Sequence, residues 1–400
     1  MAEASREASR EVWITGIGIV SCLGEGPDAH MQALGAGKPQ ADATTYPPYV
    51  IHKIAALDFD KQIPKKGDQR QMEAWQRIGT YAAGLALESA GVKGNTEILS
   101  RTDMIVAAGG GERDIAADTS ILSGLPGAAQ PDTYLNERLM SDLRPTLFLA
   151  QLSNLLAGNI SIVHGVTGSS RTFMGEESAG VDAVRIALSR IEAGQSDIAL
   201  VGGSHNSERP DLLMLYEFAG HALKDRFAPV WQREANPGFA LAAMGAFLVM
   251  ESRAHADARG AKRIARLSAV LSDRVNRKPG DVTAGLKRLW DKISSRLKPG
   301  KVAVISGASG TAPATAEERA FLAGHKDIAV RATGTYLGHA FEPQFPMNVA
   351  LAALAVSRGS LHPPADDSGV ERPMDGPLTQ AVVTAIGHWR GEGLALVEAP

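Results

Sequence analysis

The chain has a single cysteine in 400 residues, Cys22. One thiol excludes an intrachain disulfide, and it leaves no cysteine cluster that could hold zinc. Cys22 directly follows an apolar stretch that reads as a buried strand, so we interpret it as a small apolar filler rather than a reactive thiol. We therefore expect no metal site.

Long apolar runs and a strong charge of either sign are also missing. No run of eighteen apolar residues occurs, and residues 1–10 are polar and charged, so we expect no membrane insertion and a cytoplasmic location. The formal net charge is -3, and no Lys/Arg cluster is interleaved with aromatic residues, which argues against nucleic acid as a partner. The glycines 109–111 precede no nucleotide-binding pattern, so we expect no cofactor.

One segment of the chain has the layout of a strand, a sharp turn, a helix and a second strand. Residues 168–174 predict a short strand, and Gly175 lets the backbone turn sharply. Apolar residues then repeat at helical spacing over 183–191, and 197–203 reads as a buried strand. Glu177 lies at the start of the predicted helix, where free N–H groups and the helix dipole favour negative charge.

The remainder of the chain alternates predicted strands and helices, which is typical of a layered α/β fold with two mixed sheets. We expect strands near residues 11–20, 103–109, 160–174, 197–203, 245–251, 264–274, 301–306, 327–333, 380–386 and 393–398. We expect helices near residues 26–36, 70–91, 176–193, 283–296, 314–323 and 344–357. An insertion at 204–237 carries Leu212 to Tyr216 and Trp231, an apolar load that should pack against a core or a partner.

Five segments of this chain resemble, in order, the β-ketoacyl-ACP synthases, which are condensing enzymes of the thiolase superfamily. They are Glu11 to Gly24, Leu156 to Gly165, Gly202-Gly203, Gly245 to Ser252 and Gly338-His339. The resemblance implies a thiolase-like α/β fold with five layers, α/β/α/β/α, built from two pseudo-duplicated halves. We place the halves at 1–252 and 253–400.

Members of this family use a cysteine nucleophile and two histidines, and the resemblance places these positions in the chain. Glu177 stands at the cysteine position, Ser309 at the first histidine position and His339 at the second. Gly334 replaces a family lysine. A carboxylate is a poor nucleophile toward thioesters, so Glu177 should not carry an acyl chain. Removing one hydrogen-bond donor to a developing oxyanion costs about 2.7–4 kcal/mol of barrier.

The C-terminal loop also departs from the family pattern. Members end in a flexible glycine-rich segment whose phenylalanine gates the acyl pocket, whereas this chain has Gly387, His388 and Trp389 there. Because bulky side chains replace small ones, we expect a remodelled or filled pocket mouth.

The resemblance also implies partners. Family members dimerise through the strand before the turn, here 168–174, and they act on acyl carrier protein. Lys65, Lys66 and Arg70 form a small basic group that is either a docking site for an acidic carrier protein or a solvated helix entrance. Arg171, on a strand expected to be buried, should pair with Glu176 or Glu177. His164 and His205 are expected to be hydrogen-bonded structural residues.

Three hypotheses follow for the function. The first is a subunit without condensation activity of its own that resembles a chain-length factor, forming a homodimer or a heterodimer with an active synthase in fatty-acid or related acyl-chain biosynthesis. The second is an enzyme of the condensing family, either a malonyl-ACP decarboxylase or an acyltransferase that uses Ser178 or Ser309. The third is an acyl-ACP binding module. Loss of the cysteine and of one histidine favours the first.

Overall fold

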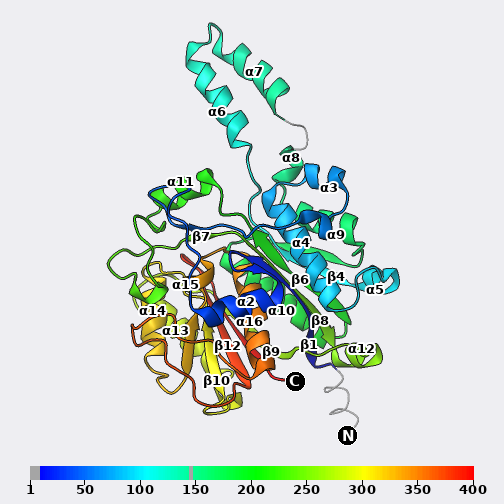
Figure 1. Cartoon of the computed structure of the whole chain (residues 1–400), viewed down its shortest axis with the longest axis vertical. Helices are drawn as coiled ribbons and strands as arrows, with labels where there is room; N and C mark the ends of the chain where they lie inside the picture. The colour runs from blue at the N-terminus through cyan, green and yellow to red at the C-terminus, as the bar shows by residue number, and fades with distance from the viewer. Residues whose placement is uncertain (1–9, 144–146) are drawn as a thin grey trace.

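The structure is a computed structural model that describes residues 10–143 and 147–400. Residues 1–9, which make up most of the N-terminal segment predicted above to be polar, lie outside the described residues. Figure 1 shows the layered body, with helices α6 and α7 projecting from it. In the part of the chain that the structure describes, no helix is long and apolar enough to cross a bilayer.

The elements follow the predicted alternation of strands and helices. The strands are β1 Val12–Ser21, β2 Gly24–Glu25, β3 Ile51–His52, β4 Asp103–Ala107, β5 Ser170–Phe173, β6 Ile198–His205, β7 Leu241–Ala242, β8 Met244–Ser252, β9 Ala265–Asp273, β10 Val302–Ser306, β11 Ala329–Ala332, β12 Gln380–Ile386 and β13 Glu392–Glu398. The helices of the first half are α2 Gly26–Ala36, α3 Lys66–Gln71, α4 Ala74–Ser89, α5 Thr96–Arg101, α6 Ile115–Gly124, α7 Pro131–Asp142, α8 Leu147–Ala150, α9 Leu155–His164, α10 Glu177–Glu192 and α11 Pro210–Phe218. The remaining helices are α12 Arg253–Ala258, α13 Asp281–Asp291, α14 Ala314–Leu322, α15 Gly334–Leu337 and α16 Gln344–Arg358.

The two groups of strands have the same order and the same directions. From the edge inward, the first group runs β5-β4-β6-β8-β1 and the second runs β11-β10-β12-β13-β9. In each group the first two pairings are parallel and the next two are antiparallel. Such a repeat is what a duplicated architecture produces. The division at residues 252 and 253 stays a prediction.

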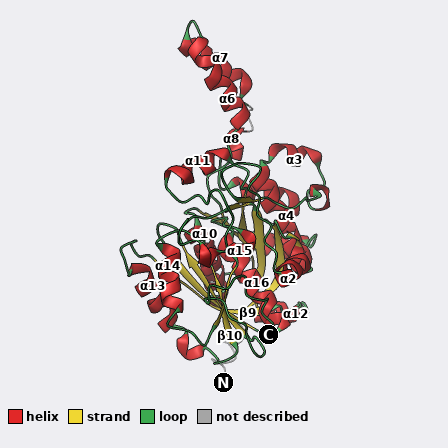
Figure 2. Ribbon diagram, turned by 60° about the vertical axis from the view of Figure 1, so that its left-hand side comes forward, coloured by secondary structure: helices red, strands yellow, loops and turns green. Residues whose placement is uncertain are grey.

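The two groups join into one sheet, so the expectation of two separate sheets is wrong. The junction is short, because β1 and β9 pair only through Trp13 with Arg266 and Ile14 with Ala265. Both groups still pack against the same central helices, α10 and α16, while α4 and α9 cover the outer face of the first and α13 and α14 that of the second. Figure 2 shows α10 and α16, with α4, α13 and α14, around the strands. Helices lie on both faces of each group of strands, so the five layers are preserved.

Close approach of the two central helices depends on small residues. A Cβ atom at Gly180 of α10 would lie 2.4 Å from the carbonyl oxygen of Glu342, just before α16, and 3.1 Å from Pro346. Helix α16 is buried on every side over most of its length, as expected for a helix in the middle layer. This packing brings the first turn of α10 against the segment that carries His339.

Several segments differ from the expected elements, and the longest of them are α9, α6 and α7. Residues 155–164 form helix α9 rather than the start of a strand, because their apolar residues pack on α4 and the real strand, β5, begins only at Ser170. Helices α6 and α7 were not expected at all. They have almost no buried residues, so the chain carries little of the periodic apolar signal that identifies a helix.

The insertion at 204–237 packs partly as predicted. Leu213, Tyr216 and Trp231 are buried, which confirms that this segment contacts a core. Met214 and Phe218 of α11 instead remain 54% and 84% exposed. The insertion therefore has one face on the body of the protein and one face outward.

Candidate functional site

Glu177 is the first residue of α10, at the end of the sharp turn that follows β5. Two residues in this turn have positive φ, Gly175 at 134° and Glu176 at 56°. A glutamate in that region costs about 1–3 kcal/mol, so neighbouring contacts must hold it there. The next residue, Glu177, is directed into the protein and is 4% exposed.

Two histidines bind the Glu177 carboxylate. Nε2 of His339 lies 2.8 Å from Oε1, and Nδ1 of His388 lies 3.0 Å from the same oxygen and 3.3 Å from Oε2. The backbone N–H of His388 also donates to Oε1, at 3.1 Å. Glu177 is thus held by His339 and by the C-terminal loop.

Electrostatics of the group follow from burial and these contacts. Burial alone would raise the pKa of Glu177, but the hydrogen bonds from His339 and His388 outweigh it and hold that pKa well below its ordinary value. Burial alone would lower the pKa of His388, yet its hydrogen bond to Glu177 and the charges of Glu177 and Glu176 raise it. Glu177 is therefore ionised at neutral pH, and its contacts favour the charged form of His388.

Glu176 also contacts the C-terminal loop, through Trp389 and His388. The indole N–H of Trp389 donates to Oε2 of Glu176, the Tyr216 hydroxyl donates to Oε1 at 3.4 Å, and Nε2 of His388 lies 3.9 Å from Oε1. These contacts hold Glu176 in its unfavourable backbone conformation. They also close the loop over Glu177, which agrees with the expected filling of the pocket mouth.

Little space remains beside the group. The cavity lined by Glu177 and His339 has a volume of about 10 Å³, and a cavity of about 10–15 Å³ holds a single water. Tyr216, Phe239 and Phe341 pack around His388, with ring centroids 5.7 to 5.9 Å from it. A larger cavity of about 490 Å³ lies against Ser178 and Arg390, but Glu177 does not line it.

Ser309 is not part of this group. Its Oγ lies 2.9 Å from Oγ1 of Thr311, and its carbonyl accepts from Nη1 of Arg233 at 3.0 Å. Among the described residues, no hydrogen bond links Ser309 to Glu177 or His339. At Gly334 a Cβ atom would lie 2.7 Å from the carbonyl oxygen of Ala308, so the backbone leaves no space there for a longer side chain.

The structure contradicts the expected ion pair of Arg171. This arginine is exposed and donates to Oγ of Ser169 at 2.9 Å. The reason is topological, because β5 is the edge strand of its group and its residue 171 is exposed there. Glu177 is buried and paired, as predicted. Its partners are His339 and His388 rather than Arg171.

Two other histidines behave as predicted. Nε2 of His164 lies 2.8 Å from the carbonyl oxygen of Thr80, and Nδ1 of His205 lies 2.8 Å from that of Ala242. Both side chains are buried, and burial lowers the pKa of each to about 4. They are neutral structural residues, as expected.

Sequence reasoning missed Glu342, a third buried carboxyl group at this site. It is 5% exposed, and burial together with the charges of Glu177 and Glu176 raises its pKa to about 8. It is therefore protonated at neutral pH. The one sequence signal is its position three residues after His339, which gives no indication of burial.

One described group has atoms placed as metal ligands could be. Carboxylate oxygens of Glu176 and Glu177 and a ring nitrogen of His388 lie within 4.8 Å of one another. Each of these side chains already takes part in the hydrogen bonds described above, and the bonds account for their burial and orientation. We therefore treat the group as an ion-paired plug.

Curated relatives are synthases of acyl chains. The chain is 26% identical over 267 residues to 3-oxoacyl-[acyl-carrier-protein] synthase 2 of Vibrio cholerae, covering 64% of this chain and 61% of the relative. It is 25% identical over 410 residues to the tetracenomycin polyketide synthase ketoacyl synthase beta subunit of Streptomyces glaucescens, covering 96% and 97%. The chain thus spans about three fifths of the first relative and nearly all of the second.

Solved structures share the fold at low identity. The ishigamide ketosynthase/chain length factor matches with a TM-score of 0.79 and 17% identity, over 98% of this chain and 99% of that one. A β-ketoacyl synthase from Burkholderia phymatum matches with a TM-score of 0.77 and 18% identity, over 98% and 100%. These matches confirm the thiolase-like fold expected from the sequence. The model of the β-ketoacyl synthase N-terminal domain matches residues 9–256, well over half of the chain, and the protein belongs to the β-ketoacyl synthase family.

Proposed function

We propose that this protein is a noncatalytic partner subunit of a condensing ketosynthase and acts as a chain-length factor does. The observation that carries the proposal is the state of Glu177. It occupies the nucleophile position, accepts hydrogen bonds from His339 and His388, and has a cavity of about 10 Å³ beside it. A cavity of that volume holds about one water and cannot hold an acyl chain.

The chemistry of the group argues against condensation by this chain alone. Acyl transfer needs a thiolate or an equally strong nucleophile, and an ionised carboxylate that binds two imidazoles is neither. The one retained histidine, His339, directs Nε2 at Glu177 at 2.8 Å. That nitrogen would have to leave the carboxylate before it could donate to a thioester carbonyl.

A partner role is supported by the relatives. One relative that covers nearly the whole chain is the ketoacyl synthase beta subunit of a polyketide synthase, and one structural neighbour is titled a ketosynthase/chain length factor. Another is a type II polyketide synthase acyl-carrier protein in complex with its ketosynthase. By analogy, we propose an acyl carrier protein and a competent ketosynthase as the partners of this chain.

Exposed apolar side chains support an interface. Several large ones lie on α6, α7, α8 and α11, an unusual concentration for a chain that functions as a monomer. They are Leu122, Leu139, Met140, Phe148, Leu149, Met214, Leu215 and Phe218. The outer edge of β5 is unpaired within the described residues, and edge strands are places where another chain can add.

The projecting helices provide a first test of partner binding. Leu122 and Met140 are 63% and 79% exposed. Replacing both by glutamate should weaken formation of the dimer with a ketosynthase about 10- to 100-fold. The fold should be unaffected, because neither side chain contacts the core. Light scattering after size-exclusion chromatography measures the effect. Asn136→Glu on the same helix as Met140 is the control, and equal dimerisation by both proteins would contradict the assignment.

The basic group at α3 provides a second test. Lys65 and Arg70 are exposed and form no ion pair with described residues, whereas Lys66 pairs with Asp60 at 2.5 Å. If this group docks a carrier protein, Lys65→Glu with Arg70→Glu should slow association about tenfold at low salt. Surface plasmon resonance with a purified acyl carrier protein measures the rate. Lys38→Glu with Lys262→Glu makes the same change in net charge at exposed positions elsewhere, and an equal effect from this control would leave the docking role without support.

Co-expression tests the main proposal. The chain and a ketosynthase with an intact cysteine and two histidines should form a heterodimer that makes products of different length from those of the ketosynthase alone. Native mass spectrometry identifies the assembly, and chromatography of the products gives their length. Elongation of acyl-ACP by the lone chain, or an acyl group bonded to it during turnover, would overturn the proposal.

The alternatives have less support in the geometry. Ser178 donates to the carbonyl of Gly175 at 2.7 Å, and no described imidazole or carboxylate accepts from it or from Ser309. An acyltransferase mechanism lacks a base at either hydroxyl group. A malonyl-ACP decarboxylase needs donors at a thioester carbonyl, and the one retained histidine is occupied by Glu177.

A further inference from the structure

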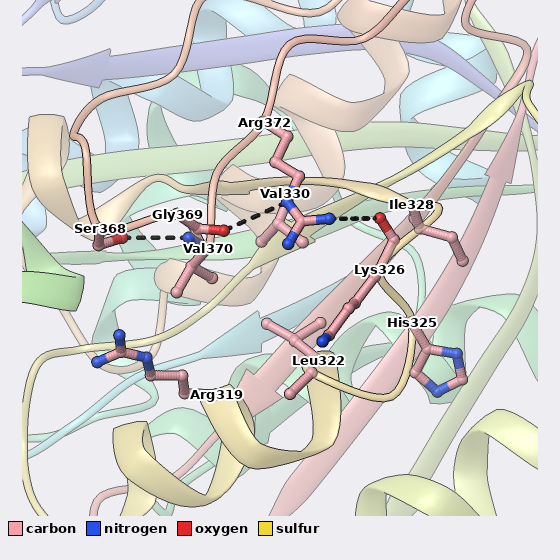
Figure 3. A pocket seen from close by; sticks show the side chains of 11 residues that line it. Arg319, Leu322, His325, Lys326, Ile328, Val330, Ser368, Gly369, Val370 and Arg372 are labelled. Atoms are coloured by element: carbon pink, nitrogen blue, oxygen red, sulfur yellow. Dashed lines mark hydrogen bonds between the residues drawn. The ribbon is translucent and has the colours of Figure 1, made fainter.

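Another pocket lies at the β11 end of the strand order. It is formed by the end of α14, the turn after it and the 368–372 segment, beside the edge strand β11 (Figure 3). It shares no lining residue with the cavity beside Glu177, so it is a separate site. Its volume is about 170 Å³.

The pocket carries positive charge without an acidic residue in its lining. Arg319, Lys326 and Arg372 line it, and no aspartate or glutamate does among the described residues. The ammonium group of Lys326 forms no hydrogen bond or ion pair with any described residue. Arg319 pairs with Glu234, whose side chain is 76% exposed.

The Arg372 guanidinium is held in place by neutral groups. Its Nη1 donates to the carbonyl oxygen of Lys326 at 2.9 Å, and its Nε donates to that of Gly369 at 3.3 Å. Figure 3 shows both contacts. Backbone carbonyls orient the guanidinium but do not neutralise it, so the group is preorganised and keeps its charge. An arginine fixed in this way presents its remaining N–H groups to a tetrahedral anion at little entropic cost.

The rest of the lining is apolar except for the Ser368 hydroxyl and the His325 imidazole. Leu322, Ile328, Val330 and Val370 make up the apolar part of the lining, here called the apolar floor. The hydroxyl oxygen of Ser368 accepts from the N–H of Val370 at 3.3 Å, which leaves its own O–H free to donate. Cationic side chains next to apolar ones match an anion that carries a short hydrocarbon chain.

We infer that this pocket binds the phosphate group of a small phosphate monoester, with Lys326, Arg372 and Arg319 around the phosphate and the organic part on the apolar floor. Phosphate suits the site because its oxygens accept from several directions, as an ammonium and two guanidinium groups require. An adjoining pocket of about 130 Å³, which Arg319 also lines, continues past Val230 and Trp231. A longer organic part can therefore extend there when Arg319 releases Glu234. The inference is independent of the proposed partner role.

Calorimetric titration of the full chain with hexyl phosphate tests the inference. Hexyl phosphate should bind at millimolar or lower concentration, more tightly than inorganic phosphate and more tightly than hexanol. Hexanoate separates the two anion classes, and it should bind more weakly because it offers fewer acceptor oxygens. Equal binding of hexanol and hexyl phosphate, equal or tighter binding of hexanoate, or no binding of hexyl phosphate would overturn the inference.

Charge-changing variants locate the binding to this pocket. Lys326→Glu should weaken hexyl phosphate binding about tenfold or more, because it removes a charge-assisted hydrogen bond and adds repulsion. Its side chain has no described partner, so the fold should be unaffected. Glu234→Gln should strengthen binding severalfold by freeing Arg319. Lys38→Glu in the other half is the matched control, and a Lys326→Glu protein that binds as well as this control would contradict the site.

Discussion

Replacement of Glu177 by alanine should lower the free energy of unfolding by about 3–5 kcal/mol, the usual cost of removing one partner from a buried charged pair. The variant leaves His388 beside Glu176 alone, and the backbone N–H of His388 loses its acceptor. Chemical denaturation measures the change. Glu192→Ala, at the exposed end of the same helix, should alter stability by no more than about 0.5 kcal/mol.

The same substitution should free the C-terminal loop. Residues 387–391 are held by Glu177 and Glu176, so their amide hydrogens should exchange faster in the Glu177→Ala protein, while the central strands keep their protection. A loss of stability below about 1 kcal/mol with unchanged exchange in the loop would show that the carboxylate does not hold the plug.

The pH dependence of this effect has a definite sign. The folded-state pKa of Glu177 is lowered, so its contribution is present above its ordinary value of 4.5 and is lost as pH falls toward the folded value. The folded-state pKa of His388 is raised, so its contribution is complete below 6.5 and is lost as pH rises through the folded value. The stability difference between wild type and Glu177→Ala should therefore be largest between about pH 4.5 and 6.5.

The sequence predicted the fold better than it predicted the contacts within the site. Strand and helix positions follow from local periodicity. The sharp turn before Glu177 could be placed because Gly175 and the helix after it have clear local signals. The insertion was identified from its apolar content. Helices α6 and α7 were missed because a helix that projects into solvent needs no apolar stripe toward its own core.

The partners of Glu177 could not be read from local patterns. His388 lies 211 residues away in the chain, and its side chain meets Glu177 only because β13 and α10 pack together. Arg171, by contrast, is close in sequence but is turned outward by the position of β5 at an edge. Burial of Glu342 depends on the contact between α10 and α16, which is a property of the assembled layers.

Replacement of Glu342 by glutamine should stabilise the protein at neutral pH. Its pKa of about 8 in the folded state, against an ordinary 4.5, means that folding takes up a proton at pH 7. Stability therefore falls as pH rises from 4.5 toward 8, and at pH 7 the cost is about 3 kcal/mol at roughly 1.4 kcal/mol per pKa unit. Glutamine has nearly the same shape and cannot ionise, so the variant should recover most of that cost.

Denaturation of wild type and Glu342→Gln at pH 4 and pH 8 checks the sign, because the two proteins should have similar stability at pH 4 and differ most at pH 8. Glu137→Gln on the exposed face of α7 should show no such divergence. The gain should also shrink in a Glu177→Ala background, since the charge of Glu177 contributes to the raised pKa of Glu342. A gain at pH 8 that persists in full without Glu177 would mean that burial alone keeps Glu342 protonated and that the two carboxyl groups act independently.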